Sequence, residues 1–299
     1  MIDLVSSLAL LSLLVAVVAA YGVRLVLRGE AHYARVDAAG SSPLLGRRLM
    51  EMAYWSLQPI ARFCQRLGMG PNAISFISMG LALVAATALA FGHFGVAAVI
   101  TAVASLGDAL DGLVARNTGV ASDAGEVLDA TIDRYFEGVF LSGLAIFYRD
   151  DAILLALVLA ALLGSFMVSY ATAKAEACHA EVPRGWMRRQ ERAVYLNVGI
   201  TIVPIVAALA PTGASIAWAK VPMFAVLGIV AFFSNVSAIR RLYALTVSLR
   251  RRDLEKAGQA EKNEPKAAAP TPPAPTPTPI SAAAAAVSSI RTNVDRRAS

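Results

Sequence analysis

Apolar residues run along most of the chain in long blocks, and short polar segments separate the blocks. The first block, residues 4–23, holds about twenty residues, the length at which an α-helix crosses the hydrocarbon layer of a bilayer. Only Asp3 precedes this block, whereas Arg24 and Arg28 follow it, which is unlike the basic leader of a signal peptide. We therefore predict an uncleaved transmembrane anchor and linker over 1–41, with the N-terminus outside and the far end of the span in the cytoplasm.

Residues 42–70 follow a different pattern, in which polar and apolar side chains recur at the period of an α-helix. Ser42 and Pro43 favour a helix start, because serine caps the first amides and proline fits the first turn. A basic amphipathic helix that carries tryptophan usually lies in the membrane interface. We predict such an interfacial helix here, since too little polar sequence surrounds it for a small soluble domain.

Six further apolar segments follow, joined mostly by short turns. They predict helices over 73–92, 95–116, 123–148, 152–178, 191–211 and 215–243. When these helices cross the membrane in alternation, their arginine-rich ends fall on the side that holds Arg47 and Arg48, which the positive-inside rule assigns to the cytoplasm. The sequence therefore predicts an all-α integral membrane protein, with a six-transmembrane-helix catalytic core over 71–249 and an extra N-terminal transmembrane helix.

The last segment, 250–299, starts basic and becomes rich in proline, alanine and threonine. This composition cannot bury a hydrophobic core, so we predict a disordered C-terminal tail. Two roles stay open for it: a solvated tail without a partner, or a proline-rich segment that recruits one.

Composition supports a membrane protein and excludes one class of partner. The chain is 57% hydrophobic and 16% charged, whereas soluble domains are about one quarter charged. Its net charge of +6 comes from Lys and Arg that cluster at the ends of apolar runs, so we predict membrane lipids as partners and no nucleic acid. The two cysteines and three histidines form no cluster suited to a metal.

Four aspartates lie inside the otherwise apolar stretch 107–133. They belong to the pattern D-x2-D-G-x2-A-R-x8-G-x3-D-x3-D, filled by Asp108, Asp111, Gly112, Ala115, Arg116, Gly125, Asp129 and Asp133. Spacings of three and four put each pair of aspartates on one helical face, and antiparallel neighbouring helices would bring the pairs together. Carboxylates this close repel one another unless cations lie between them, and hard divalent cations prefer oxygen ligands. We predict a site for Mg2+ or Mn2+, with two ions as in other sites for displacement at phosphorus.

Two other interpretations of the aspartates are open. They could be helix caps or ion-pair partners of Arg116 and Arg134, or they could form a cation or proton pathway in a transporter. A transport pathway gives no reason for Gly112, Arg116 and Gly125 at these spacings.

The pattern resembles the signature of the CDP-alcohol phosphatidyltransferase family, and the resemblance spans about 71–249. It implies a Mg2+-dependent transfer of a phosphatidyl group from CDP-diacylglycerol to an alcohol, with release of CMP. It also implies that all four aspartates bind the metal ions and that Asp133 is the general base that takes the acceptor's hydroxyl proton. The residues implied in binding the CDP-lipid are Pro71, Asn72, Ala73, Ile74, Gly112, Arg116, Ser122 and Gly125.

A basic region downstream, SYATAKAEACHAEVPRGWMRRQER, resembles the part of family members that use phosphorylated polyols such as inositol phosphate or glycerol phosphate. Lysine and arginine suit a second phosphate because they give charge-assisted hydrogen bonds. The residues predicted to bind the acceptor phosphate are Lys174, Arg188, Arg189 and Arg192. The competing interpretation is that these cations serve only topology and lipid headgroups.

Rival functions remain open beside phosphatidyl transfer to a polyol phosphate. They are transfer of a CDP-alcohol headgroup to diacylglycerol, divalent-cation transport and a non-catalytic membrane scaffold. Short cytoplasmic loops and the lack of an organelle signal favour a bacterial inner membrane, with the active site on the cytoplasmic side. The resemblance also allows a homodimer, which nothing in the sequence demonstrates. The first span and the proline-rich tail depart from a minimal family member.

Overall fold

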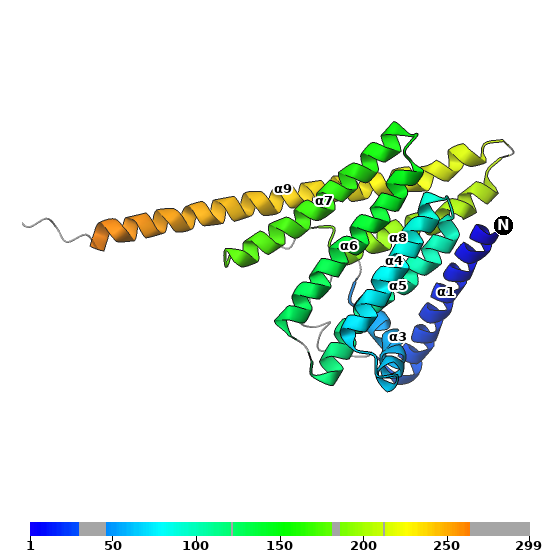
Figure 1. The fold of residues 1–299 in the computed structure, drawn as a ribbon, viewed down its shortest axis with the longest axis horizontal. Coiled ribbons are helices and arrows are strands. Elements are labelled where there is room, and N and C mark those ends of the chain that lie inside the picture. Colours follow the sequence, from blue (N-terminus) through cyan, green and yellow to red (C-terminus); the bar gives the residue numbers. More distant parts are fainter. Residues whose placement is uncertain (30–45, 121, 181–185, 212, 264–299) are drawn as a thin grey trace, which may run out of the picture. The chain divides into compact units, whose positions relative to one another are not determined.

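The structure is a computed structural model, and it describes residues 1–29, 46–120, 122–180, 186–211 and 213–263. All secondary structure in these residues is helical, which confirms the predicted all-α class (Figure 1). The helices are α1 (Ile2–Arg28), α3 (Gly46–Arg66), α4 (Pro71–Ala90), α5 (Phe94–Thr118), α6 (Asp123–Phe147), α7 (Ala152–Ala177), α8 (Arg189–Leu209) and α9 (Ser215–Asn263).

Six helices of the described chain are long and apolar enough to cross a membrane: α1, α4, α5, α7, α8 and α9. Helix α6 is not one of these six, because its composition is too polar, although we predicted it as a span. The reason is that its first half carries the charged residues Asp123, Glu126, Asp129, Asp133, Arg134 and Glu137. Its second half is apolar, and Phe140, Leu141 and Leu144 are buried in the main hydrophobic core. Helix α6 therefore joins a polar site to the core of the bundle.

Local sequence signals set the ends of the helices around this site. Proline opens α4 at Pro71, where its missing N–H costs nothing. Helix α5 ends at Gly119, whose φ of +70° is the left-handed conformation that glycine adopts readily. Ser122 then caps α6, because its hydroxyl accepts a hydrogen bond from the Gly125 amide at 3.2 Å. These turns fix how the loop between α5 and α6 leaves one helix and enters the next.

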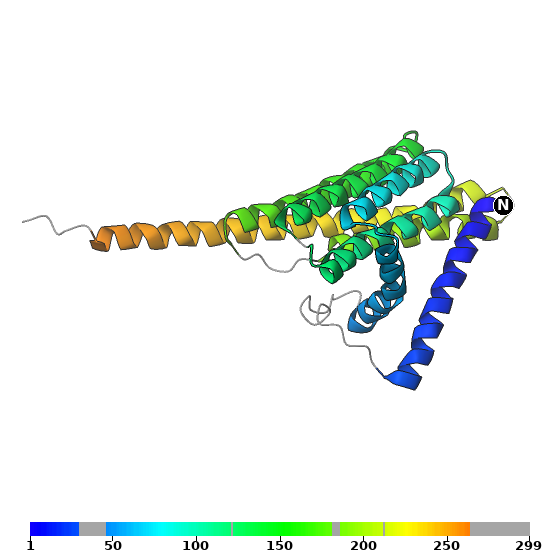
Figure 2. The ribbon, with the colours of Figure 1, turned by 60° about the horizontal axis from the view of Figure 1, so that its bottom comes forward.

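Helices α4, α5 and α6 form the centre of the bundle, and both α5 and α6 pack against α4 (Figure 1, Figure 2). Helix α8 packs against α5, and α7 packs against α6. Small residues allow close contacts between these helices: a Cβ added at Gly143 of α6 would lie 2.5 Å from the carbonyl oxygen of Ala86 in α4. The main core combines buried residues of six helices, among them Leu89, Ala98, Leu144, Val158, Ile200 and Leu227.

The first helix is attached to the core through Asp3. One carboxylate oxygen of Asp3 accepts hydrogen bonds from the amides of Gly95 and Val96, at 2.9 and 3.2 Å. Asp3 therefore caps the first turn of α5 from another helix. Near the other end of α1, the guanidinium of Arg24 lies 5.9 Å from the ring centre of Trp55 in α3. Most side chains of α1 are exposed, as expected for a span that faces lipid.

Helix α3 has the amphipathic character that the sequence predicted. Its buried residues Leu57, Ala61 and Cys64 pack against Ile74 of α4 and against residues of α5. Ser42 and Pro43, the predicted start of this helix, lie outside the described residues.

The end of the chain corrects one prediction. Leu249 ends one compact unit and Arg250 begins another, but α9 continues to Asn263, so 250–263 is helical rather than disordered. Its arginine, leucine, glutamate, lysine and alanine residues are strong helix formers, and Arg251 pairs with Glu255 one turn later at 3.0 Å. The proline-rich part, 264–299, lies outside the described residues, and its disorder stays a prediction.

Candidate active site

Two helices carry the four aspartates of the sequence pattern. Asp108 and Asp111 lie in the last turns of α5, and Asp129 and Asp133 lie in the first half of α6. Carboxylate oxygens of Asp108, Asp111 and Asp129 lie within 4.8 Å of one another. The structure thus brings three of the four predicted metal ligands together across two helices. Asp133 stands beside this cluster, in an ion pair with Arg189 of α8.

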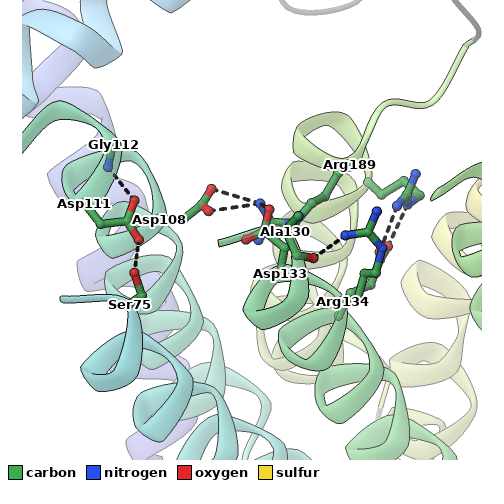
Figure 3. A network of polar contacts seen from close by, with 10 residues as sticks. Ser75, Asp108, Asp111, Gly112, Ala130, Asp133, Arg134 and Arg189 are labelled. Atoms are coloured by element: carbon green, nitrogen blue, oxygen red, sulfur yellow. Dashed lines mark hydrogen bonds and ion pairs between the residues drawn. The ribbon is translucent and has the colours of Figure 1, made fainter. Parts of the chain in front are cut away.

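Asp111 is the most buried of the three clustered aspartates, with 4% of the residue exposed. Its two oxygens accept separate hydrogen bonds, one from the hydroxyl of Ser75 in α4 at 2.5 Å and one from the amide of Gly112 at 2.5 Å (Figure 3). A buried carboxylate with both oxygens held in this way has little freedom to rotate. Ser75 therefore orients a predicted metal ligand, and sequence reasoning did not single it out.

Arg189 connects the two pairs of aspartates. One terminal nitrogen of its guanidinium lies 3.0 Å from each carboxylate oxygen of Asp108, and the same nitrogen pairs with Asp133 (Figure 3). The three side chains are partly exposed, at 28%, 25% and 16% for Arg189, Asp108 and Asp133. We predicted Arg189 as a ligand of the acceptor phosphate, but the structure places its guanidinium on the aspartates.

The chemistry of this donor set fits a divalent cation. Three carboxylates that converge within 4.8 Å offer the hard oxygen ligands that Mg2+ and Mn2+ prefer. One guanidinium carries a single positive charge and contacts Asp108 and Asp133, so it balances only part of the negative charge of four aspartates. A divalent ion would balance two of the three negative charges that remain.

The residues predicted to bind the CDP-lipid lie on three helix ends around the aspartates. Pro71, Asn72, Ala73 and Ile74 form the first turn of α4. Asn72 and Ala73 are exposed there, whereas Ile74 is buried against α3 and α5. Only part of this turn is therefore accessible to a ligand.

The other predicted CDP-lipid residues flank the loop between α5 and α6. The guanidinium of Arg116 lies over Gly112, where an added Cβ would be 3.1 Å from an Arg116 nitrogen. Ser122 and Gly125 are bonded to each other in the cap of α6. An added Cβ at Gly125 would meet only the Ser122 hydroxyl, so the space beside this glycine is otherwise open among the described residues.

The remaining predicted acceptor cations occupy different environments. Lys174 is exposed at the last turn of α7, and Arg188 is partly buried just before α8. Arg192 is only 1% exposed, and its Nε and Nη2 donate to the two oxygens of Glu137 at 2.6 and 2.8 Å. Its Nη1 donates to the carbonyl of Met187 at 3.0 Å. The sequence predicted an arginine free to bind phosphate, but the structure places Arg192 in a buried ion pair.

Two charged residues of this region were missed from the sequence. Glu137 follows Asp129 and Asp133 at a spacing of four on α6, a repeat that could have revealed it. Arg241 of α9 was counted only as a topology signal, yet it is 9% exposed. Its Nη1 donates to Thr172 of α7 at 2.6 Å, its Nε has no partner among the described residues, and the charges of Arg192 and Arg188 act on it.

The pattern of aspartates, glycines and arginine now has a matching fold and a matching family model. The family sequence model of CDP-alcohol phosphatidyltransferases matches residues 69–249, and these residues contain every part of the site. The chain belongs to the CDP-alcohol phosphatidyltransferase family. This confirms the predicted class of membrane enzyme.

Relatives of this phosphatidyltransferase carry a more specific name. It is 33% identical over 162 residues to the phosphatidylinositol phosphate synthase of Corynebacterium glutamicum, covering 52% of this chain and 74% of the relative. It is 30% identical over 216 residues to the synthase of the same name from Mycobacteroides abscessus, covering 69% of this chain and 93% of that one.

Solved structures with the same fold include complexes of phosphatidylinositol phosphate synthase from Mycobacterium tuberculosis. A crystal structure of that protein with CDP-DAG bound matches with a TM-score of 0.54 and 27% identity, over 62% of this chain and 92% of that one. A crystal structure in complex with manganese and citrate matches with a TM-score of 0.56 and 26% identity, over 64% and 88%. The phosphatidyltransferase fold of this chain is thus one in which related proteins hold a CDP-linked lipid and a divalent metal.

Proposed function

We propose that this phosphatidyltransferase moves a phosphatidyl group from CDP-diacylglycerol to a phosphorylated polyol and releases CMP. The observation that carries the proposal is the convergence of Asp108, Asp111 and Asp129 within 4.8 Å, beside Arg189 of α8. The bound CDP-DAG in a related structure supports the donor, and the names of the bacterial relatives support inositol phosphate as the acceptor.

The metal ligands of the proposal are the four aspartates, holding two ions of Mg2+ or Mn2+. Bound ions would neutralise the diphosphate of the CDP-lipid and stabilise the phosphate that leaves with CMP. Gly125 and the end of α5 leave room for the nucleotide beside these carboxylates, while Arg116 supplies a positive charge for the diphosphate. Pro71, Asn72 and Ala73 complete this side of the site at the start of α4.

Asp133 is the proposed general base. Its carboxylate takes the proton of the acceptor hydroxyl while the hydroxyl oxygen bonds to the β-phosphorus and the bond from that phosphorus to the CMP oxygen breaks. Asp133 and Asp108 contact the same Arg189 nitrogen, so their carboxylates lie close together and Asp133 stands beside the metal cluster. A carboxylate in that place can reach a hydroxyl that approaches the diphosphate.

The acceptor phosphate would bind to the cations between α7, α8 and α9. Arg241 is the strongest contributor to this part of the proposal, because its buried Nε has no partner among the described residues and Arg192 and Arg188 add positive charge around it. Arg192 stays paired with Glu137 and adds charge without leaving that pair. Lys174, exposed at the end of α7, can meet the phosphate from the solvent side.

The proposed location is the cytoplasmic side of a bacterial inner membrane. The end of α5, the start of α6 and the start of α8 share the site, so the aspartates and the arginine-rich segments lie on one side of the spans. The positive-inside rule assigns that side to the cytoplasm. A homodimer also remains a proposal, resting on the family resemblance alone.

The test is CMP release by the detergent-purified protein with CDP-diacylglycerol, in the presence of Mg2+ or Mn2+. The acceptors are inositol 1-phosphate, glycerol 3-phosphate, free inositol and serine, and an Asp129→Asn variant is the control for contaminating activity. Release only with a phosphorylated polyol supports the whole proposal. Release with serine or free inositol keeps the transferase but contradicts the phosphate site. A separate assay supplies a CDP-alcohol and diacylglycerol in place of CDP-diacylglycerol and the acceptors, and release in that assay alone would reverse the proposed direction of transfer.

A further inference from the structure

Two groups of charged residues act on Arg189, one from the proposed metal site and one from the proposed acceptor site. Arg189 contacts Asp108 and Asp133, which are proposed metal ligands. The charge of Glu137 also acts on Arg189, and Glu137 is the partner of Arg192. A long arginine side chain in this position can be held by one group or drawn toward the other.

The helical register of α8 makes the second group accessible to Arg189. Arg192 follows Arg189 by three residues, so the two side chains project from neighbouring positions of one helix face. Arg192 and Arg188 in turn lie close enough to Arg241 for their charges to act on it. Arg189 is thus the arginine of this segment that contacts the aspartates, while the charges of the other two act on Arg241, whose Nε has no partner among the described residues.

We propose that Arg189 is an internal counter-ion that a divalent cation displaces from Asp108 and Asp133, and that the displaced guanidinium then helps to bind the acceptor phosphate. This rests on the metal and acceptor sites of the proposed function. Asp108 cannot direct both oxygens to the Arg189 nitrogen, each at 3.0 Å, and also give them fully to a metal. A metal ion that binds there repels the guanidinium and competes for the same oxygens.

Displacement of Arg189 would couple the metal site and the acceptor site positively. A metal ion that releases Arg189 leaves a positive side chain beside Arg188, Arg192 and Arg241, which raises the affinity of that cluster for an anion. By thermodynamic reciprocity, an anion that attracts Arg189 away from the aspartates raises the affinity for the metal by the same factor. Arg189 would therefore favour a site in which metal and acceptor are bound together over one that holds either alone.

The first test is the affinity of the detergent-solubilised full-length protein for Mn2+, measured from the electron paramagnetic resonance signal of the free ion in chloride buffer. Arg189→Gln removes the competing charge, so we expect Mn2+ to bind about fivefold more tightly or better. Arg149→Gln removes the same charge from an exposed residue that pairs with Asp150 just beyond the end of α6, and it should leave Mn2+ affinity within about twofold. Equal or weaker Mn2+ binding by a folded Arg189→Gln protein would overturn the inference.

The second test begins with the wild-type protein alone. Sulfate is used as a tetrahedral anion in place of the acceptor phosphate, at the same ionic strength as the chloride control. We expect sulfate to tighten Mn2+ binding to the wild-type protein about fivefold, and to have less than half that effect on Arg189→Gln. An unchanged Mn2+ affinity of the wild type in sulfate would overturn the coupling even if the variant failed to fold.

These measurements separate the inference from the function on which it rests. Failure of the wild-type protein to bind Mn2+ at all would contradict the proposed metal site, and the inference would fall with it. Normal Mn2+ binding and CMP release with no effect of Arg189→Gln or of sulfate would leave the proposed function standing and overturn the role of Arg189 alone.

Discussion

Glu137 of α6 and Arg192 of α8 form a buried bidentate ion pair, with N–O distances of 2.6 and 2.8 Å. Glu137 lies one helical turn beyond Asp133, so the pair holds α8 against the helix that carries the proposed base. A pair buried this deeply is sensitive to the loss of either partner, because the remaining charge is left without compensation.

Glu137→Gln should therefore destabilise the protein strongly. We expect a loss of about 3–5 kcal/mol, the range for breaking a buried ion pair by removing one partner. Unfolding of the detergent-solubilised protein measures it, and Glu137→Gln combined with Arg192→Met should cost less than the two single changes together. Asp150→Asn, which affects an exposed pair with Arg149, is the control and should change stability little. Additive effects of the two buried substitutions would contradict a coupled pair.

Ser75→Ala should weaken metal binding without changing a metal ligand. The Ser75 hydroxyl donates to Asp111 at 2.5 Å, and loss of a hydrogen bond that orients a ligating carboxylate typically lowers metal affinity about 10–100-fold. Mn2+ titration measures this effect. Ser78→Ala is the matched control: Ser78 is buried on the same helix, but its hydroxyl donates to the carbonyl of Ile74. Equal losses in both variants would indicate a general disturbance of α4 instead.

Asp133→Asn should stop turnover while the protein stays folded. Asparagine keeps the shape of the side chain but cannot take a proton, and removal of a general base lowers rates by about 10²–10⁴-fold. CMP release measures the rate, and Mn2+ affinity shows whether the metal site survives. Asp129→Asn is the comparison: Asp129 belongs to the three-carboxylate cluster and Asp133 stands beside it, so Asp129→Asn should lose more Mn2+ affinity than Asp133→Asn. Substantial turnover by Asp133→Asn would remove Asp133 from the role of base.

The fold was largely predictable because its signals are local. Apolar blocks of spanning length and caps such as Gly119 and Ser122 place the ends of five of the six predicted core helices within about three residues of the observed ends. The length of α9 was not predictable from hydropathy, since 250–263 is held by helix propensity and pairs such as Arg251 with Glu255.

The site was predictable only in part, because contacts between helices decide the rest. The convergence of Asp108, Asp111 and Asp129 followed from helical spacing. Which arginine would reach the aspartates, and which would be buried with Glu137, depends on how α8 packs against α5 and α6. A sequence pattern holds no information on such side-chain partners, and the same limit explains why Ser75 and Arg241 were missed.

Asp151 should give the stability a dependence on acidic pH. Its carboxylate caps α7 and pairs with Lys220 of α9 at 2.7 Å. The hydrogen bond from Lys220 is the main cause that lowers the Asp151 pKa. A carboxyl with a lowered pKa stabilises the fold above its unfolded pKa of about 3.9, and this contribution is lost as the pH falls through the lower folded value. Asp151→Asn keeps a capping side chain and removes the charge. Its Tm should lie below the wild-type Tm at pH 7, and the two should converge below about pH 4; a constant difference would exclude the carboxylate charge as the cause.

Arg241→Gln should separate acceptor binding from donor binding. Loss of one charged hydrogen-bond donor to a phosphate costs about 1.5–3 kcal/mol, so we expect the KM for the phosphorylated acceptor to rise at least tenfold. The KM for CDP-diacylglycerol should change less than twofold, because Arg241 contacts Thr172 rather than the aspartates and the charges that act on it are those of Arg188 and Arg192.

Arg240→Gln is the control, since Arg240 is the neighbouring residue on the same helix and its guanidinium stacks on Trp186, 4.8 Å from the ring centre. Lys174→Ala should resemble Arg241→Gln more weakly, because an exposed lysine is already screened by water and salt. Equal changes in both KM values for Arg241→Gln would mean that the arginine cluster serves the bundle or the lipid headgroups, which is the alternative that the sequence left open.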